Sequence, residues 1–105
     1  MPHFALTTKH GPGWDPRRPI REQDGWREHA AFMDSLVDCG LIIVGGPLGN
    51  GDRTLHLVES TDEGTVRARM SEDPWAKADR LLVDTVEPWH LWLGNLGRDQ
   101  APAVQ

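Results

Sequence analysis

The stretch that decides the fold is LIIVGGPLGNG, residues 41–51. Its first four residues are β-branched or aliphatic, which is typical of a buried strand, and the Gly-Gly-Pro that follows bends or bulges that strand. The Asn50-Gly51 pair is a strong hairpin signal, and alternation resumes over residues 53–59. The sequence therefore predicts two strands joined by a tight turn. In the second strand we expect Leu55 and Leu57 on one face, with Thr54, His56 and Val58 on the other.

A helix is predicted on each side of this hairpin. The first begins between Ile20 and Asp24, with Asp24 as a candidate N-cap, and ends at residue 38 or 39, just before Gly40. The second starts in the acidic segment 60–63 and ends near Ser71.

Two outer strands and a short helical turn complete the pattern. The turn starts with Asp73 as N-cap and Pro74 in the first helical position, and it runs through Ala78. Alternation predicts strands over residues of about 3 to 9 and 81 to 93, the first followed by a proline-rich loop. The order βαββαβ is that of the ferredoxin-like α+β fold, an antiparallel sheet with helices on one face.

Length and composition limit the classes of protein. A chain of 105 residues is one small domain, which we place over residues 1–94 with a C-terminal tail over 95–105. The net charge of -5 and the scattered basic residues disfavour nucleic acid as a partner. No apolar run is long enough to span a membrane, the N-terminus is too polar for a signal peptide, and the lone Cys39 favours a reducing, cytoplasmic setting.

One layer of helices leaves the other face of the sheet uncovered. We expect Trp92, Val58 and Ala5 on that face, where they form an apolar patch that a second subunit would bury. The sequence therefore predicts a homodimer, with the tail after Gly94 either flexible or packed on the partner subunit.

Four short segments carry a family resemblance: Arg27-Glu28-His29, Gly45-Gly46-Pro47-Leu48, Asp73-Pro74-Trp75 and Pro88-Trp89. Together with the element order, they resemble the YCII-related (YciI-like) proteins over residues of about 3 to 94. The resemblance implies a dimeric α+β barrel of ferredoxin-like subunits. It also implies a cleft with a histidine and an aspartate as the active-site pair, which here are His29 and Asp73.

The resemblance also indicates a reaction class. One branch similar to this family removes chloride from a chlorinated hydroxyquinol, so we expect lyase-like acid/base chemistry on a small organic or hydroxylated aromatic compound. Two alternatives stay open: a non-catalytic module that binds a small molecule in the same cleft, and a purely structural dimer.

The residues themselves allow two interpretations of the pair. His29 lies on the apolar stripe of its helix with Trp26, Ala30 and Met33, where a polar group needs a partner. It is either a general acid or base held by a carboxylate, or a buried histidine bonded to the backbone. Asp73 is either a helix cap or the partner of that histidine, and a carboxylate with two oxygens can be both.

Further candidates lie in the loops. His10 and Trp14 follow the first strand and either contact a ligand through hydrogen bonding and stacking or anchor their loop. We also assign Gly46 and Pro47 to ligand binding.

We expect no metal and no cofactor. The five histidines form no HxH or HxxxH pair, and the glycines form neither GxGxxG nor a P-loop. No serine lies in a nucleophile elbow, and Cys39 at a helix end is expected to be structural.

Overall fold

The structure, a computed structural model, describes residues 1–94. The expected tail, residues 95–105, lies outside them. The elements are, in chain order, β1 (His3–His10), the 3-10 helix η1 (Ile20–Glu22), α1 (Trp26–Asp38), β2 (Ile42–Leu48), β3 (Arg53–Glu59), α2 (Glu63–Met70), α3 (Pro74–Lys77) and β4 (Leu81–Pro88).

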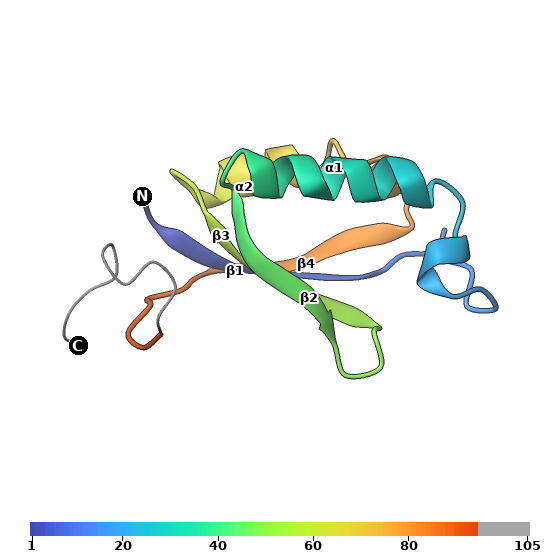
Figure 1. Cartoon of the computed structure of the whole chain (residues 1–105), viewed down its shortest axis with the longest axis horizontal. Coiled ribbons are helices and arrows are strands. Elements are labelled where there is room, and N and C mark those ends of the chain that lie inside the picture. Colours follow the sequence, from blue (N-terminus) through green and yellow to red (C-terminus); the bar gives the residue numbers. More distant parts are fainter. Residues whose placement is uncertain (95–105) are drawn as a thin grey trace.

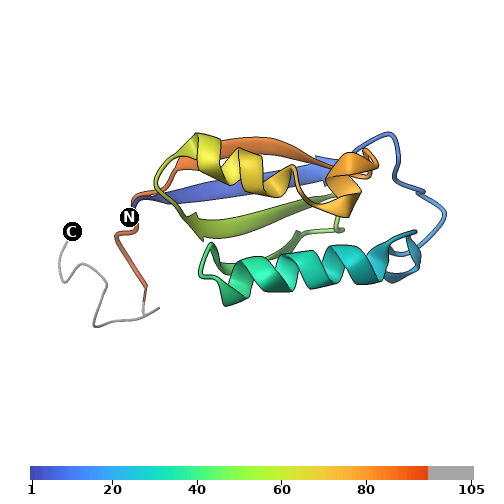
Figure 2. The same cartoon turned by 90° about the horizontal axis from the view of Figure 1, so that it is seen from above.

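The strands form one four-stranded antiparallel sheet in the order β2-β3-β1-β4. The α-helices lie on one face of it (Figure 1). Seen from above, α1 runs beside β2 and β3, while α2 runs beside β4 (Figure 2). The predicted ferredoxin-like arrangement is therefore confirmed.

Local chemistry sets the helix ends. The side chain of Asp62 accepts a hydrogen bond from the backbone N–H of Thr65 at 2.7 Å and caps α2, and Asp73 with Pro74 starts α3 as predicted. Gly40 follows α1 with a φ of 86°, in the left-handed region that glycine favours.

The start of α1 differs from the prediction. Gly25 is the N-cap, with a φ of 76°, and no side chain caps the helix. The carboxylate of Asp24 does not cap the helix. It contacts Arg18 at 3.2 Å and Arg80 at 3.6 Å instead. The prediction of Asp24 as N-cap was wrong because a left-handed residue intervenes before the helix begins.

Two expectations about the uncovered face also need correction. Strand β4 ends at Pro88 rather than residue 93, so Trp92 lies beyond the sheet with 67% of its surface exposed. Val58 faces the helices and is fully buried in the core with Leu36 and Val66. Alternation had correctly grouped Val58 with His56, but the helices cover the face that carries both.

The layer between sheet and helices has two chemically different ends. The apolar end, next to the C-terminal half of α1, is built of Phe4, Leu6, Leu36, Leu41, Ile42, Val58, Val66, Met70 and Val86. The polar end, toward the N-terminus of α1, contains Thr8, His29, Thr54, His56 and Asp73. The polar end is where chemistry can occur.

Candidate functional site

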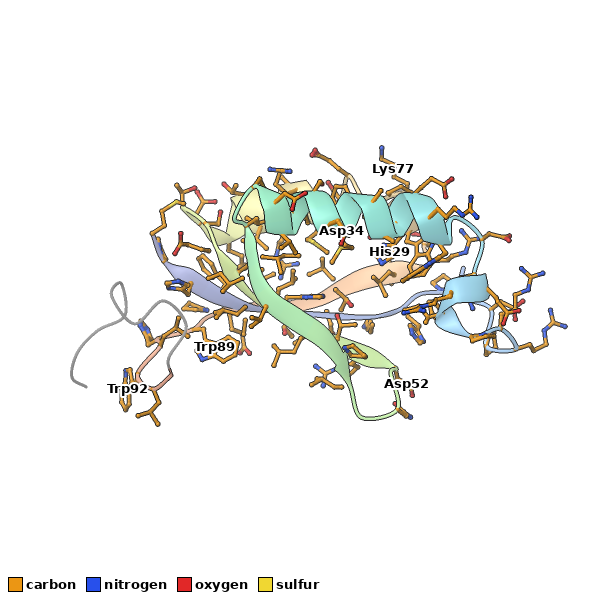
Figure 3. All side chains as sticks on the ribbon, in the orientation of Figure 1. His29, Asp34, Asp52, Lys77, Trp89 and Trp92 are labelled. Carbon is orange, nitrogen blue, oxygen red and sulfur yellow. The ribbon has the colours of Figure 1, made fainter. Side chains whose placement is uncertain are left out.

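His29 lies on the buried side of α1, facing the sheet (Figure 3). Only 6% of its surface is exposed. Its Nδ1 lies 3.0 Å from Oδ1 and 2.8 Å from Oδ2 of Asp73. The predicted approach of the two residues is therefore confirmed as geometry, across 44 positions of sequence.

Asp73 serves two partners from a buried position. It is 1% exposed, and its Oδ1 accepts a hydrogen bond from the backbone N–H of Trp75 at 3.0 Å while its carboxylate also contacts His29. Helix capping and orientation of the imidazole are thus combined in one carboxylate.

This contact determines which nitrogen of His29 is left for chemistry. An ionised carboxylate only accepts hydrogen bonds, so Nδ1 of His29 carries the proton and donates. Within residues 1–94, no group forms a hydrogen bond with Nε2 of the same ring, and it is not fully enclosed. The free lone pair on Nε2 can accept a proton from a bound molecule.

The indole of Trp75 packs against the face of the His29 imidazole. The two rings stack with their centroids 3.9 Å apart and an angle of 5° between their planes. The indole N–H of Trp75 donates to the backbone carbonyl of Asp24 at 2.7 Å, which fixes the ring's rotation. In the sequence, Trp75 was named only within the segment Asp73-Pro74-Trp75, and its position directly after Asp73-Pro74 was the available signal for its role.

The aromatic contacts continue into the loop after β1. Trp14 packs edge-on against Trp75 with centroids 5.6 Å apart, and His10 stacks on Trp14 at 3.7 Å. His10 and Trp14 also line an open hollow of about 450 Å³ together with Lys9, Gly11, Pro16, Asp52 and Arg53. The contacts anchor the loop against the site, and ligand binding by these two residues stays a prediction.

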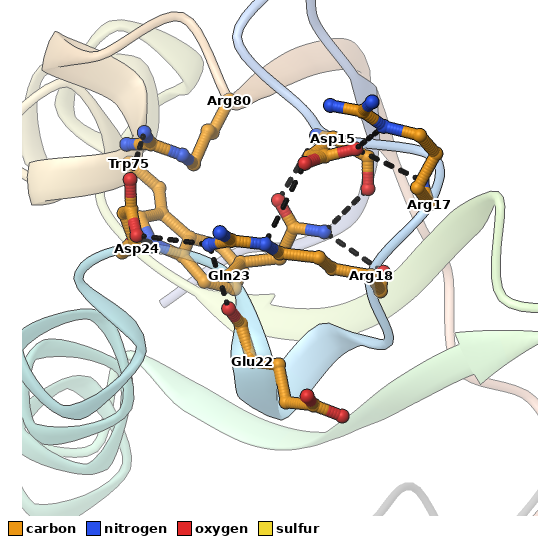
Figure 4. Close-up of polar contacts among 8 residues, drawn as sticks. All are labelled: Asp15, Arg17, Arg18, Glu22, Gln23, Asp24, Trp75 and Arg80. Atoms are coloured by element: carbon orange, nitrogen blue, oxygen red, sulfur yellow. Dashed lines mark hydrogen bonds and ion pairs between the residues drawn. The ribbon is translucent and has the colours of Figure 1, made fainter.

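A buried glutamine holds this loop in place (Figure 4). The side chain of Gln23, 3% exposed, accepts from the backbone N–H of Asp15 and donates to the carbonyls of Asp15 and Arg18. Sequence reasoning missed Gln23, because nothing in the local pattern distinguishes it from a surface glutamine.

Gly46 and Pro47 lie apart from the pair, on the edge strand β2 opposite Leu55 and Thr54. An added Cβ on Gly46 would meet no atom within 4 Å. None of the contacts found in residues 1–94 joins either residue to His29 or Asp73. Their role in ligand binding stays a prediction.

The neighbouring Gly45 instead accommodates a second buried histidine. His56 pairs with Gly45 across β2 and β3, and a Cβ on Gly45 would lie only 1.8 Å from its Nδ1. That Nδ1 is buried and has no hydrogen-bond partner in the described part of the chain. Burial lowers the pKa of His56, and the positive charge of a protonated His29 lowers it further. The sequence analysis assigned no role to His56.

A small cavity of about 230 Å³ adjoins Asp73 between the helices and the sheet. Thr8, Met70, Leu81 and Val83 are among its lining residues. His29 does not line it, so the expectation that the pair shares one cavity wall holds for the aspartate only. Nowhere in the described chain do three His, Cys, Asp or Glu side chains lie close enough together to bind a metal ion.

No helix among residues 1–94 is long and apolar enough to cross a membrane.

Comparison with known proteins gives one structural likeness. The structure of 5-chloro-2-hydroxyhydroquinone dehydrochlorinase (TftG) from Burkholderia phenoliruptrix AC1100, in complex with 2,5-dihydroxybenzoquinone, matches with a TM-score of 0.53. The two sequences are 22% identical, and the match covers 87% of this chain and 95% of the other. The fold is shared. No family model and no curated protein matches the chain.

Proposed function

We propose that this chain is a YciI-like enzyme of lyase type in which His29 is the general base and Asp73 holds and orients it. The observation that carries the proposal is the hydrogen bond of Nδ1 to both carboxylate oxygens, at 3.0 and 2.8 Å, with no partner for Nε2 within residues 1–94. This is the arrangement in which a carboxylate stabilises the imidazolium formed by proton transfer.

The proposed step needs no cofactor. In the keto tautomer of the substrate, where the carbon that bears the leaving group is saturated, Nε2 of His29 takes a proton from a neighbouring carbon or a hydroxyl group, and the electron pair left behind expels the leaving group, such as chloride, as an anion. The proton then passes from Nε2 to water. A hydroxylated aromatic compound is the proposed substrate class, and the shared fold with a dehydrochlorinase supports it.

A direct assay tests this proposal. We expect purified protein to release chloride from 5-chloro-2-hydroxyhydroquinone or a related chlorinated hydroxyquinol. His29→Asn and Asp73→Asn are each expected to lower kcat/KM by about 10²- to 10⁴-fold, the usual contribution of a positioned base. His90→Asn and Asp34→Asn are matched controls, because both residues are exposed and lie outside the site.

The outcomes separate the alternatives. A His29→Asn variant that folds and keeps full activity would exclude the histidine as the base. If the wild type and all four variants bind the ligand without turnover, the non-catalytic binding module is favoured. The supporting observation for that alternative is the same unpartnered Nε2, which can also accept a hydrogen bond from a ligand.

We also propose a homodimer, located in the cytoplasm, formed through the sheet face opposite the helices. Register places Val44, Leu48 and Leu55 on this open face. Val44 is 47% exposed and Leu48 is 40% exposed, and each Å² of apolar surface left in water costs about 25 cal/mol. Trp89, on the same side of the sheet, is 37% exposed (Figure 3).

Light scattering at micromolar concentration tests the dimer. Val44→Asp is expected to give monomers, because it would bury a charge in the interface. Val37→Asp is the matched control: Val37 is 50% exposed but lies on α1, on the other side of the molecule. A wild-type chain that stays at 11.7 kDa would contradict the proposal.

A further inference from the structure

His56 is a buried polar residue that the proposed reaction has not used. It lies in β3 between Gly45 of β2 and Leu6 of β1, on the face covered by the helices, and 9% of its surface is exposed. A leucine or valine would fill such a position without leaving a polar atom unpaired. The histidine therefore needs a reason other than packing.

The two nitrogens of His56 have different surroundings. Nδ1 is fully buried against the backbone of Gly45, where it has no acceptor and no donor. A proton on Nδ1 would be a buried donor with no partner, which is costly, so the neutral ring carries its proton on Nε2. Nε2 is not enclosed in this way among residues 1–94. The ring is thereby held as a neutral donor that presents one N–H.

His56 shares the helix-facing side of β3 with Thr54, which contacts Thr8, and Thr8 lines the same cavity as Asp73, the partner of His29. Seen from above, β3 lies between α1 and α2 (Figure 2), and His29 points from α1 toward the sheet (Figure 3). The two imidazoles are close enough for charge on His29 to lower the pKa of His56. One ring then offers a free acceptor and the other a free donor.

We propose that His56 is a ligand-contacting residue whose Nε2–H donates a hydrogen bond to a phenolic or quinone oxygen of the substrate held beside His29. This inference rests on the proposed function and specifies its substrate class: a ring with an oxygen next to the group that loses its proton. Negative charge that develops on that oxygen during proton removal would strengthen the bond, as a preorganised donor does for an oxyanion.

The first test is NMR of protein labelled with ¹⁵N-histidine, without ligand. The expected result is a neutral His56 protonated on Nε2 at pH 7. A ring protonated on Nδ1, or a charged ring at pH 7, would overturn the inference.

The second test is calorimetric binding of 2,5-dihydroxybenzoquinone, which carries four oxygens on one ring. We expect His56→Leu to weaken binding by about 10- to 100-fold, the effect of losing one hydrogen bond to a charged or strongly polarised oxygen. His56→Gln retains an N–H donor and is expected to recover part of that loss. Thermal unfolding of each variant shows that the fold is kept.

The outcomes distinguish the two proposals. If the wild type binds and His56→Leu binds equally well, the role of His56 is overturned while the proposed function stands. If His56→Leu does not fold, the NMR test on the wild type decides: an Nδ1–H ring overturns the role, and an Nε2–H ring supports it. If the wild type binds none of the dihydroxyquinone, the proposed substrate class fails, and the ligand contact of His56 fails with it.

Discussion

The two ends of the layer between sheet and helices bury different kinds of side chain, and each kind is stabilised in a different way. At the apolar end, Leu36, Val58 and Val66 are fully buried and need only complementary shape. At the polar end, each buried group needs a hydrogen-bond partner, and His29 and Asp73 supply each other's. Stability is concentrated at the first end and the proposed chemistry at the second, where one buried nitrogen of His56 has no partner within residues 1–94.

The largest expected loss of stability is at the apolar end. Leu36→Ala should lower the free energy of unfolding by about 2–5 kcal/mol, through lost burial and the cavity left behind. Urea denaturation measures it, and Val37→Ala, at an exposed position of the same helix, should change it by less than about 0.5 kcal/mol. Similar losses for the two variants would mean that the apolar end is loosely packed.

Asp73→Asn is expected to cost less, about 1–3 kcal/mol, because an amide can still cap α3, but the NH2 group that replaces Oδ2 is a donor and cannot accept from Nδ1 of His29. Asp62→Asn is the matched control, since Asp62 caps α2 at an exposed position and asparagine caps equally well. An equal effect in both variants would show that the contact with His29 adds nothing to stability.

Gly45→Ala should destabilise the fold by about 1–3 kcal/mol, because its Cβ would collide with the ring of His56. In a His56→Ala background the same change should cost little, which a double-mutant cycle measures as coupling. Gly46→Ala, with open space around its Cβ, is the control. Additive effects would contradict the close contact of Gly45 with His56.

The smallest effect is in acid stability. Because the pKa of His56 is lowered by burial, the unfolded chain binds a proton below about pH 6.5 that the folded chain does not. Stability should therefore fall as the pH drops below that value, by at most about 1.4 kcal/mol per pH unit from this group. His56→Leu should flatten the dependence measured between pH 7 and 5. His10→Gln is the comparison, since burial also lowers the pKa of His10, at a less buried position.

Much of the fold could be predicted because its signals are local. The hairpin at Asn50-Gly51, the cap at Asp73 and the glycine after α1 depend only on neighbouring residues. Alternation correctly grouped Val58 with His56, but a period of two cannot say which face the helices will cover. The end of β4 also depends on pairing with β1, so the pattern up to residue 93 overextended it.

The site was less predictable because its contacts are distant in sequence. His29 and Asp73 are separated by 44 residues, and their pairing was expected from a family resemblance rather than from spacing. Trp75 and Gln23 act through tertiary contacts that no local pattern reveals. His56 stands out only once its unpartnered nitrogen and the glycine opposite are seen together.

The two contacts of Asp73, with the start of α3 and with His29, also limit how this protein can evolve. One carboxylate begins α3 and holds His29, so in the proposed enzyme a substitution of Asp73 that alters the chemistry also disturbs a helix end. Selection on activity and selection on foldability therefore act on the same atoms. Divergence toward new substrates is easier in the loop of His10 and Trp14 and along the edge strand β2, where a change leaves that carboxylate untouched.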